Sequence, residues 1–316
     1  MPRPILVPLD GSDFAERAIP PALAIAERNG LRVELVLVHE PFVAAPSGRS
    51  ARPFVDPARD GEWRSRHGAY VRDLVARLQK STTVPVSGLV MDGAIAAGIV
   101  EHTVSSDAQL VVMATHADTP GSRLWLGSVP RAIAQASPVP VVLIKPGEGP
   151  PVEQYHKVLI PLDGSHASES AMQYASLVAG KSAVDYTLLR VVTPVEEWEV
   201  GAGSWSSEDD LAISEANEYL ETHAERFREN GYAVATAVIR ARRSAEAILR
   251  YAKENGIDLI SVTTHSRSAT SRFFRRSVAD RIAREPHIAS VVARHSEPVS
   301  LSGQSARSKA RAEALI

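Results

Sequence analysis

The chain contains no cysteine, which excludes disulfide bonds, thiolate metal sites and a cysteine nucleophile. It also has little excess charge, because 35 Lys and Arg stand against 37 Asp and Glu and give a net charge of −2. Such a balance offers no broad attraction to nucleic acid or to an anionic membrane surface. These absences favour a protein of the reducing cytoplasm with neither of those partners.

Long apolar runs are missing as well. The first ten residues, MPRPILVPLD, hold a short apolar run that ends at Asp10, which fits a first strand better than a secretory signal or a membrane span. The 316 residues, 44% of them hydrophobic, suffice for two domains that each bury a core. Residues 296–316 are polar and rich in small side chains, and we expect a loose tail there.

What the chain does contain is an internal repeat. ILVPLDGSDFAERAI returns as VLIPLDGSHASESAM, so that PLDGS occupies positions 8–12 and 161–165. VVMATHADTPGSRLWLGSVPRAIA likewise returns as ISVTTHSRSATSRFFRRSVADRIA. Matching blocks in one order indicate a duplicated domain. We predict domains over 1–147 and 157–295, joined by a Pro- and Gly-rich linker over 148–156.

Each repeat alternates short apolar runs with amphipathic segments. In the first repeat the runs are ILVPL, VELVLV, VPVSGLV, LVVMA and VPVVLIK, and we expect helices over 14–29, 63–78, 95–104 and shortly after 128. The residues that share one helical face in the first repeat are Trp63, His67, Val71, Leu74 and Leu78. Those that share one in the second repeat are Ile213, Ala216, Leu220, Ala224 and Phe227. This alternation predicts an α/β fold with a parallel sheet and helices on both faces.

The last apolar run of the first repeat belongs at a sheet edge. SPVPVVLIK contains two prolines, and proline cannot donate a hydrogen bond within a sheet. Its counterpart in the second repeat is IASVVARH. We expect the two runs to pair about a pseudo-twofold axis, which would hide both edges. Pairing of two whole chains in a homodimer stays open.

The PLDGS blocks, the Thr-His pairs at 115–116 and 264–265 and the Gly-Ser pair at 127–128 together resemble the universal stress protein family in its tandem form. The resemblance implies two doubly wound, Rossmann-like domains of the adenine nucleotide α-hydrolase type, each with a five-stranded parallel sheet. It also implies a stress-response protein without catalytic activity. Family members that bind ATP carry Gly-x-x-Gly, nine residues and then Gly-Ser or Gly-Thr.

The resemblance places the nucleotide site of the first repeat on Asp10, Ala114, Ala117, Gly127 and Ser128. The equivalent positions of the second repeat are Asp163, Thr263, Ser266, Arg276 and Ser277. The family aspartate that contacts the nucleoside is present in both repeats, as Asp10 and Asp163. After a strand and before a helix, either aspartate can instead serve only the turn, and the sequence leaves both roles open.

The substitutions in the glycine motif weaken this expected site. Gly127 and Ser128 keep a helix start that favours an anion. Alanine at 114 and 117 costs on the order of 1 kcal/mol per position if the backbone there needs a positive φ, and little otherwise. We therefore expect weak or absent ATP binding in the first repeat and none of the usual kind in the second. The alternative is a nucleotide-free scaffold that acts through its surface or through dimerisation.

Other candidates receive simpler interpretations. The arginines of the second loop and its helix, among them Arg281 and Arg284, fit a solvated surface that pairs with nearby acids better than an anion site. Asp10, His116 and Ser128 do not make a hydrolytic triad, because the sequence has no Gly-x-Ser-x-Gly turn and Ser128 fits a helix N-cap. His116 and His265 fit structural histidines. The histidine spacing predicts no metal site.

Overall fold

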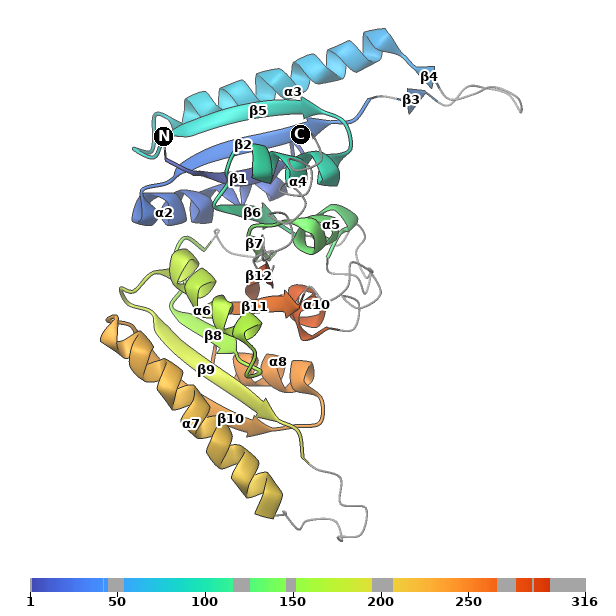
Figure 1. The fold of residues 1–316 in the computed structure, drawn as a ribbon. Coiled ribbons are helices and arrows are strands. Elements are labelled where there is room, and N and C mark those ends of the chain that lie inside the picture. Colours follow the sequence, from blue (N-terminus) through green and yellow to red (C-terminus); the bar gives the residue numbers. More distant parts are fainter. Residues whose placement is uncertain are drawn as a thin grey trace, which may run out of the picture.

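The computed structural model describes residues 2–41, 43–44, 54–115, 126–145, 152–194, 207–265, 277–285 and 287–295. Within them, ten strands form one sheet in the order β10-β9-β8-β11-β12-β7-β6-β1-β2-β5. Each repeat contributes five strands, and helices cover both faces (Figure 1). The α/β class and the five parallel strands per repeat are therefore confirmed.

The first repeat runs from β1 to β7. Its strands in the large sheet are β1 (Pro4–Leu9), β2 (Arg32–His39), β5 (Val86–Asp92), β6 (Leu110–Ala114) and β7 (Val141–Ile144), and a small separate pair is formed by β3 (Val43–Ala44) and β4 (Phe54–Val55). Its helices are α1 (Asp13–Glu16), α2 (Ile19–Asn29), α3 (Pro57–Leu78), α4 (Ile95–Ser105) and α5 (Ser128–Ala136).

The second repeat runs from β8 to β12. Its strands are β8 (Lys157–Pro161), β9 (Asp185–Val192), β10 (Ala233–Arg240), β11 (Leu259–His265) and β12 (Ala289–His295). Its helices are α6 (His166–Ala179), α7 (Ser207–Glu229), α8 (Ser244–Glu254) and α10 (Val278–Ala283). On α7 the predicted apolar face is confirmed, because Ala216, Leu220 and Ala224 are buried.

The two repeats meet at the strand pair that the prolines predict. β7 and β12 run antiparallel, with Val142 opposite Val291 and Leu143 opposite Ser290. Parallel pairing holds elsewhere in the sheet, from β2·β5 to β10·β9. The predicted pseudo-twofold pairing of VPVVLIK with IASVVARH is therefore confirmed.

Two predicted helices differ from the structure, and a third, for which no start was predicted, is longer than its apolar pattern. The helix expected over 14–29 is two helices, because Pro20 and Pro21, in the first turn of α2, lack the amides that would continue α1. The helix expected from 63 begins at Pro57, where the Asp56 side chain accepts hydrogen bonds from the amides of Ala58 and Arg59 at 3.1 and 3.3 Å. The helix of the second repeat begins at Ser207, ahead of the periodic apolar residues.

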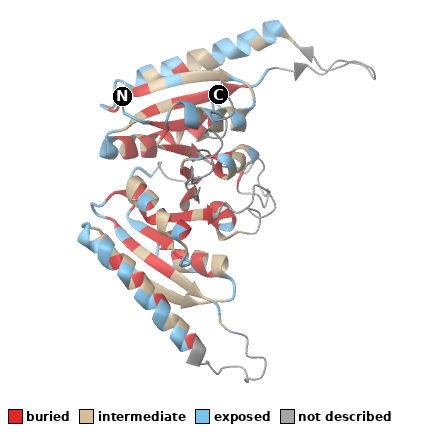
Figure 2. Cartoon of the chain, in the orientation of Figure 1, coloured by how far each residue is buried: buried red, intermediate tan, exposed pale blue. Residues whose placement is uncertain are grey.

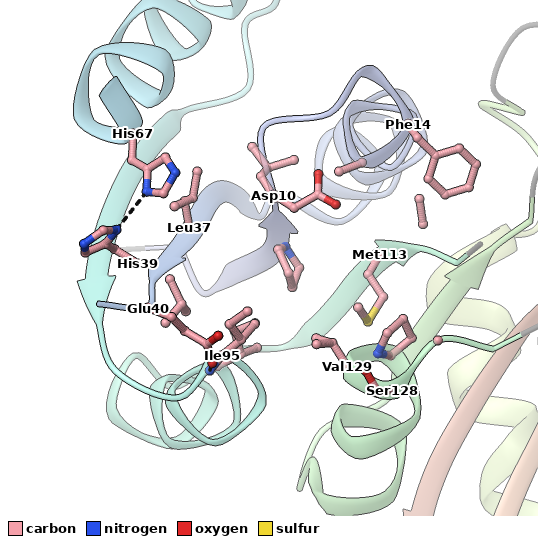
Figure 3. A pocket seen from close by; sticks show the side chains of 18 of the residues that line it. Asp10, Phe14, Leu37, His39, Glu40, His67, Ile95, Met113, Ser128 and Val129 are labelled. Carbon is pink, nitrogen blue, oxygen red and sulfur yellow. Dashed lines mark hydrogen bonds between the residues drawn. The ribbon is translucent and has the colours of Figure 1, made fainter. Parts of the chain in front are cut away.

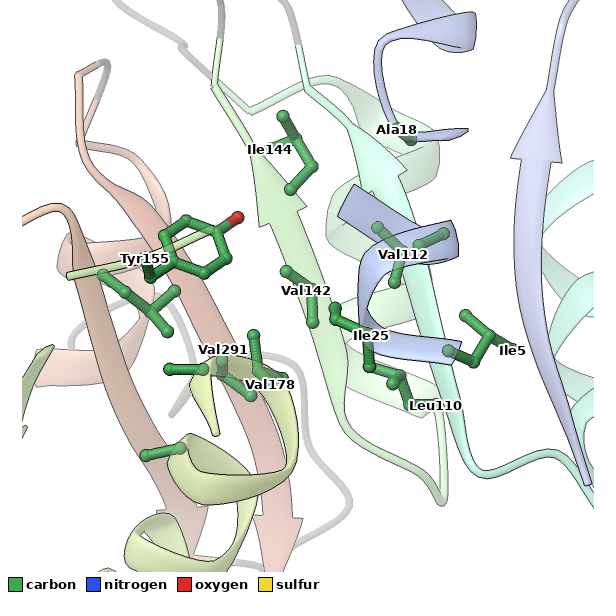
Figure 4. Close-up of a cluster of buried hydrophobic side chains, with 14 of the residues drawn as sticks. Ile5, Ala18, Ile25, Leu110, Val112, Val142, Ile144, Tyr155, Val178 and Val291 are labelled. Carbon is green, nitrogen blue, oxygen red and sulfur yellow. The ribbon is translucent and has the colours of Figure 1, made fainter. Parts of the chain in front are cut away.

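Apolar side chains form a buried cluster on each face of the sheet, and both clusters continue across the repeats. One includes Ile25 on α2, Val142 on β7, Val178 on α6 and Val291 on β12, all of which Figure 4 shows close to the strand pair that joins the repeats. The other contains residues of α4, α5, α8 and α10. The outward faces of α3 and α7 are exposed (Figure 2). A shared core makes the repeats one structural unit.

Polar contacts reinforce this joint where α2 ends beside α6. The Arg28 guanidinium donates to the carbonyl oxygen of Val178 at 2.7 Å, and the Asn29 amide donates to that of Leu177 at 3.0 Å. Both acceptors lie in the last turn of α6, where carbonyls lack partners within the helix. None of the helices described here is long and apolar enough to cross a membrane.

Candidate functional site

A cavity of about 610 Å³ opens at the carboxyl ends of β1, β2 and β6. Strand β1 lies between β6 and β2, so the chain leaves β1 toward one neighbour and later returns on its other side. Ligands of open α/β sheets bind at such a switch point, beyond the carboxyl ends of the strands. The volume lies within the range of small-molecule sites.

The cavity is apolar along its walls and polar at its ends. Its apolar lining includes Leu9, Leu37, Ile95, Ile99, Met113 and Val129. Figure 3 shows His39 and His67 at one end, Ser128 and Val129 at the other, and Asp10 between them. An elongated ligand with a flat apolar part and an anionic part fits this order of groups.

The structure brings together four of the five residues expected in the first repeat. Asp10, Ala114, Gly127 and Ser128 all line the cavity. Ala117 lies outside the described residues. These four residues therefore lie at one cavity, at the ends of two strands and at the start of a helix.

Asp10 has a structural role in the turn after β1. Its Oδ1 accepts hydrogen bonds from the Ser12 amide at 2.9 Å and from the Ser12 hydroxyl at 2.6 Å. Asp163 makes the same contacts with Ser165, at 3.0 and 2.6 Å. The turn occupies one carboxylate oxygen in each repeat. Asp10 Oδ2 has no hydrogen-bond partner within the described part of the chain, and Asp10 is exposed at the cavity.

The N-cap of α5 is Gly127, and the expectation that Ser128 caps this helix is wrong. Gly127 has a φ of −60° and a ψ of 167°, an extended conformation, and no side chain caps the helix start. Ser128 is the first helical residue and is exposed. The amides of Ser128 and Val129 therefore point out of the first turn, where they and the helix dipole favour an anion.

The backbone of Ala114 carries no strain. Ala114 ends β6 opposite Ile144, and among the described non-glycine residues only Asp107 and Ala183 have a positive φ. A glycine is therefore not needed at position 114 for its conformation. The possible strain cost considered from the sequence does not apply to this residue.

The second repeat has different side chains at the corresponding positions. Thr263, equivalent to Ala114, donates its hydroxyl to the carbonyl oxygen of Ala167 in α6 at 2.7 Å. Pro8 pairs with Val36, and Pro161 pairs with Leu189, so the next residues, Leu37 and Arg190, are equivalent.

Arg190 therefore stands where the cavity-lining Leu37 stands in the first repeat. Its guanidinium lies over the Tyr219 ring, 5.3 Å from the centroid. Ser266 and Arg276 lie outside the described residues.

The helix starts of the two repeats differ in their capping. In α10 the Ser277 hydroxyl accepts a hydrogen bond from the Asp280 amide at 3.1 Å, and the buried Asp280 carboxylate pairs with Arg284 at 2.9 Å. The residue of α5 equivalent to Asp280 is Arg131. The start of α10 thus has a side-chain cap and an ion-paired Asp280, whereas the start of α5 has no side-chain cap.

Sequence analysis missed the histidine end of the cavity. His39 is only 2% exposed; its Nε2 lies 3.0 Å from Asp60 Oδ1 and its Nδ1 lies 3.3 Å from His67 Nδ1. Burial, and then the charge of His39, lower the pKa of His67. Position at the end of β2 could have identified His39, and His67 shares a predicted helical face with Trp63, which also lines the cavity.

The described residues offer no metal site, since no three histidine or acidic side chains among them gather in a way that could hold an ion. The arginines of α10 pair with acids, as expected: Arg281 lies 3.1 Å from Glu246, and Arg284 pairs with Asp280. His116 lies outside the described residues, and for His265 only its place at the end of β11 is described.

Comparison with known proteins gives consistent matches across the chain. A family model described as "Universal stress protein family" matches residues 1–145 and 154–294. A universal stress protein of Mycobacterium tuberculosis is 26% identical over 302 residues, which cover 92% of this chain and 96% of that protein. One of Thermus aquaticus is 31% identical over 142 residues, which cover 45% of this chain and 97% of that protein.

Solved structures agree on the fold. The crystal structure of a universal stress protein from Archaeoglobus fulgidus has a TM-score of 0.69 at 16% identity, covering 93% of this chain and 98% of that one. A structure from Pseudomonas aeruginosa, described as a putative universal stress protein, has a TM-score of 0.65 at 14% identity and covers 93% of each chain.

Proposed function

Because the chain belongs to the universal stress protein family, we propose that its first repeat binds one adenine nucleotide, that its second repeat serves as a structural partner, and that the protein catalyses no reaction. We further propose the units 1–147 and 157–295 as its domains, with residues 148–156 as the linker. The span of the Thermus aquaticus match supports a unit of this size. The lack of cysteine supports a place in the cytoplasm.

The observation that carries this proposal is the difference between the two helix starts. In the first repeat an α5 without a side-chain cap, with Arg131 in its first turn, borders a cavity of about 610 Å³. In the second repeat the Ser277 hydroxyl accepts a hydrogen bond from the Asp280 amide, and the Asp280 carboxylate is paired with Arg284. The uncapped start of α5 leaves its amides open to a triphosphate, whereas the Ser277 cap already uses one amide at the start of α10.

The rest of the cavity suits a nucleoside. Leu37, Ile95 and Met113 provide apolar surface for a purine ring, and Asp10 offers a carboxylate oxygen to ribose hydroxyls. Arg190 and Thr263 take up the equivalent positions in the second repeat. The expected stoichiometry is therefore one nucleotide per chain.

The absence of catalysis is proposed from the chemistry of the residues. A serine nucleophile needs a base within hydrogen-bond reach, and the exposed Ser128 makes no such bond to a histidine among the residues described. Its position as the first residue of α5 supports a role in binding instead.

The experiment is a calorimetric titration of the purified chain with ATP, together with analysis of any nucleotide released when the protein is denatured. The proposal predicts binding at one site per chain and no hydrolysis of ATP over hours. Two sites per chain would refute the assignment of the second repeat. An empty extract and no heat at millimolar ATP would favour the nucleotide-free scaffold.

A further inference from the structure

A series of three hydrogen-bonded side chains ends at the cavity. Asp60 on α3 contacts His39 Nε2, and His39 at the end of β2 contacts His67 Nδ1. Figure 3 shows the His67 side chain extending from α3 beside Leu37, with His39 on its other side. His39 and His67 both line the cavity, so this chain connects a carboxylate to one end of the proposed nucleotide site.

The order of donors and acceptors in this chain is determined by Asp60. A carboxylate only accepts hydrogen bonds, so His39 must carry its proton on Nε2. A neutral His39 then has a bare Nδ1, which accepts. The contact of 3.3 Å between the two Nδ1 atoms therefore requires the proton on His67 Nδ1. It follows that Nε2 of a neutral His67 is a bare acceptor.

We propose that His67 Nε2 accepts a hydrogen bond from the exocyclic 6-amino group of the bound base, and so selects a 6-amino purine over a 6-oxo purine. This inference rests on the proposed nucleotide site. It assigns the base to the histidine end of the cavity and the phosphates to the start of α5, the two ends that Asp10 separates in Figure 3. The apolar residues Leu37 and Ile95 lie beside the base in this arrangement.

The selectivity follows from pairing a donor with an acceptor. The amino group of adenine donates to Nε2, whereas the oxygen of hypoxanthine is itself an acceptor and leaves Nε2 without a partner. One lost hydrogen bond of this kind corresponds to about tenfold in affinity. Asp60 and His39 act as positioning residues, because they determine which nitrogen of His67 carries the proton.

The same series of hydrogen bonds makes the preference for a 6-amino purine depend on pH. If one proton is added to the histidine pair, either His67 is a cation or a charged His39 donates to His67 Nδ1. In both cases Nε2 of His67 carries hydrogen and becomes a donor, which favours the 6-oxo base. The lowered pKa of His67 keeps Nε2 an acceptor at pH 7.5. The charged groups around the pair are Asp60 and Arg64 of α3, Glu40 after β2, Asp92 of β5, and Asp10 after β1.

The test is a calorimetric comparison of ATP with inosine triphosphate, which differ at position 6 of the base. We expect the natural chain to bind ATP about tenfold more tightly at pH 7.5. His67→Phe should bind both equally, whereas His166→Phe, which changes an exposed histidine of the second repeat, should keep the preference. For the natural chain the preference for ATP should shrink as the pH is lowered and the histidine pair takes up a proton. The ionisation of the triphosphate is common to both ligands and does not change this comparison.

A second variant tests the positioning role. In Asp60→Asn the asparagine amide can donate to His39 Nε2, and this allows the donors and acceptors of the three side chains to reverse their order. The preference for ATP over inosine triphosphate should then fall, while ATP still binds. A His67→Phe protein that keeps the full preference, or a natural chain that binds both nucleotides equally at pH 7.5, overturns the inference and leaves the proposed function standing. If the natural chain binds neither nucleotide, both this inference and the proposed function are refuted.

Discussion

Arg190 packs its guanidinium against the backbone of Gly164, so that a Cβ added to this glycine would lie 2.5 Å from Nη1. Gly164 has a φ of +86° in the turn after β8, and Gly11 has the same φ in the turn after β1, with nothing within 4 Å of an added Cβ. The two glycines thus share one backbone conformation and differ in their surroundings.

This difference predicts unequal costs of the same substitution. Gly11→Ala should lower the free energy of unfolding by about 1 kcal/mol, because alanine is strained at positive φ. Gly164→Ala should cost more, since Arg190 must also move. Urea denaturation measures both, and adding Arg190→Ala to each variant should remove the excess cost of Gly164→Ala. If Gly11→Ala and Gly164→Ala lower the free energy of unfolding equally, Arg190 moves aside at no measurable cost, which contradicts the prediction.

The burial of Lys145 predicts that the stability of the protein depends on pH. It lies at the end of β7, is 8% exposed and donates to the carbonyl oxygen of Ala283 at the end of α10. Burial lowers its pKa from the ordinary 10.5 to about 7, against a smaller opposing effect of Glu285. Between these two values the unfolded chain binds the proton and the folded chain does not, so stability rises with pH over this window.

The measurement is the free energy of unfolding at several pH values for the natural chain and for Lys145→Met. The natural chain should gain stability relative to Lys145→Met as the pH rises from about 7 to 10.5. Lys157→Met is the control, because Lys157 is exposed and donates to the carbonyl oxygen of Asn255 at a helix end, at 3.2 Å. A difference between the natural chain and Lys145→Met that stays flat with pH would contradict the account.

Replacing Ala114 by glycine is predicted to have only a small effect on ATP binding. Because its backbone is a strand without positive φ, Ala114→Gly relieves no strain and should change the affinity for ATP by less than about threefold, while costing about 0.5–1 kcal/mol of stability. The control is Ala117→Gly, at the other filled glycine position of the motif. A gain of tenfold or more from Ala114→Gly would identify its methyl group as the obstacle to the ligand.

The sequence predicted the features that depend on local pattern. Duplication was visible in PLDGS, strand positions in the apolar runs, and the joint of the repeats in the prolines of SPVPVVLIK. Helix ends were predicted less well, because proline and aspartate capping act at single positions: Pro20 and Pro21 divide one segment, and Asp56 extends another beyond its apolar pattern.

The histidine end of the site could not be predicted in full. His39 and His67 lie 28 residues apart on a strand and a helix, and their contact depends on how α3 packs against β2. The equivalence of Leu37 and Arg190 likewise requires the strand register. Periodicity placed His67 on the correct helical face, but only the fold shows that this part of the face borders a cavity.

The most direct test of the central claim, that the first repeat alone holds the phosphates, is an ATP titration of two matched variants. Ser128→Asp puts a carboxylate in the first turn of α5, where it stabilises the helix and repels a triphosphate, so affinity should fall about tenfold or more. Ser277→Asp keeps a capping side chain on α10 and should leave the affinity unchanged. Unchanged binding in Ser128→Asp, or an equal loss in Ser277→Asp, would contradict the account.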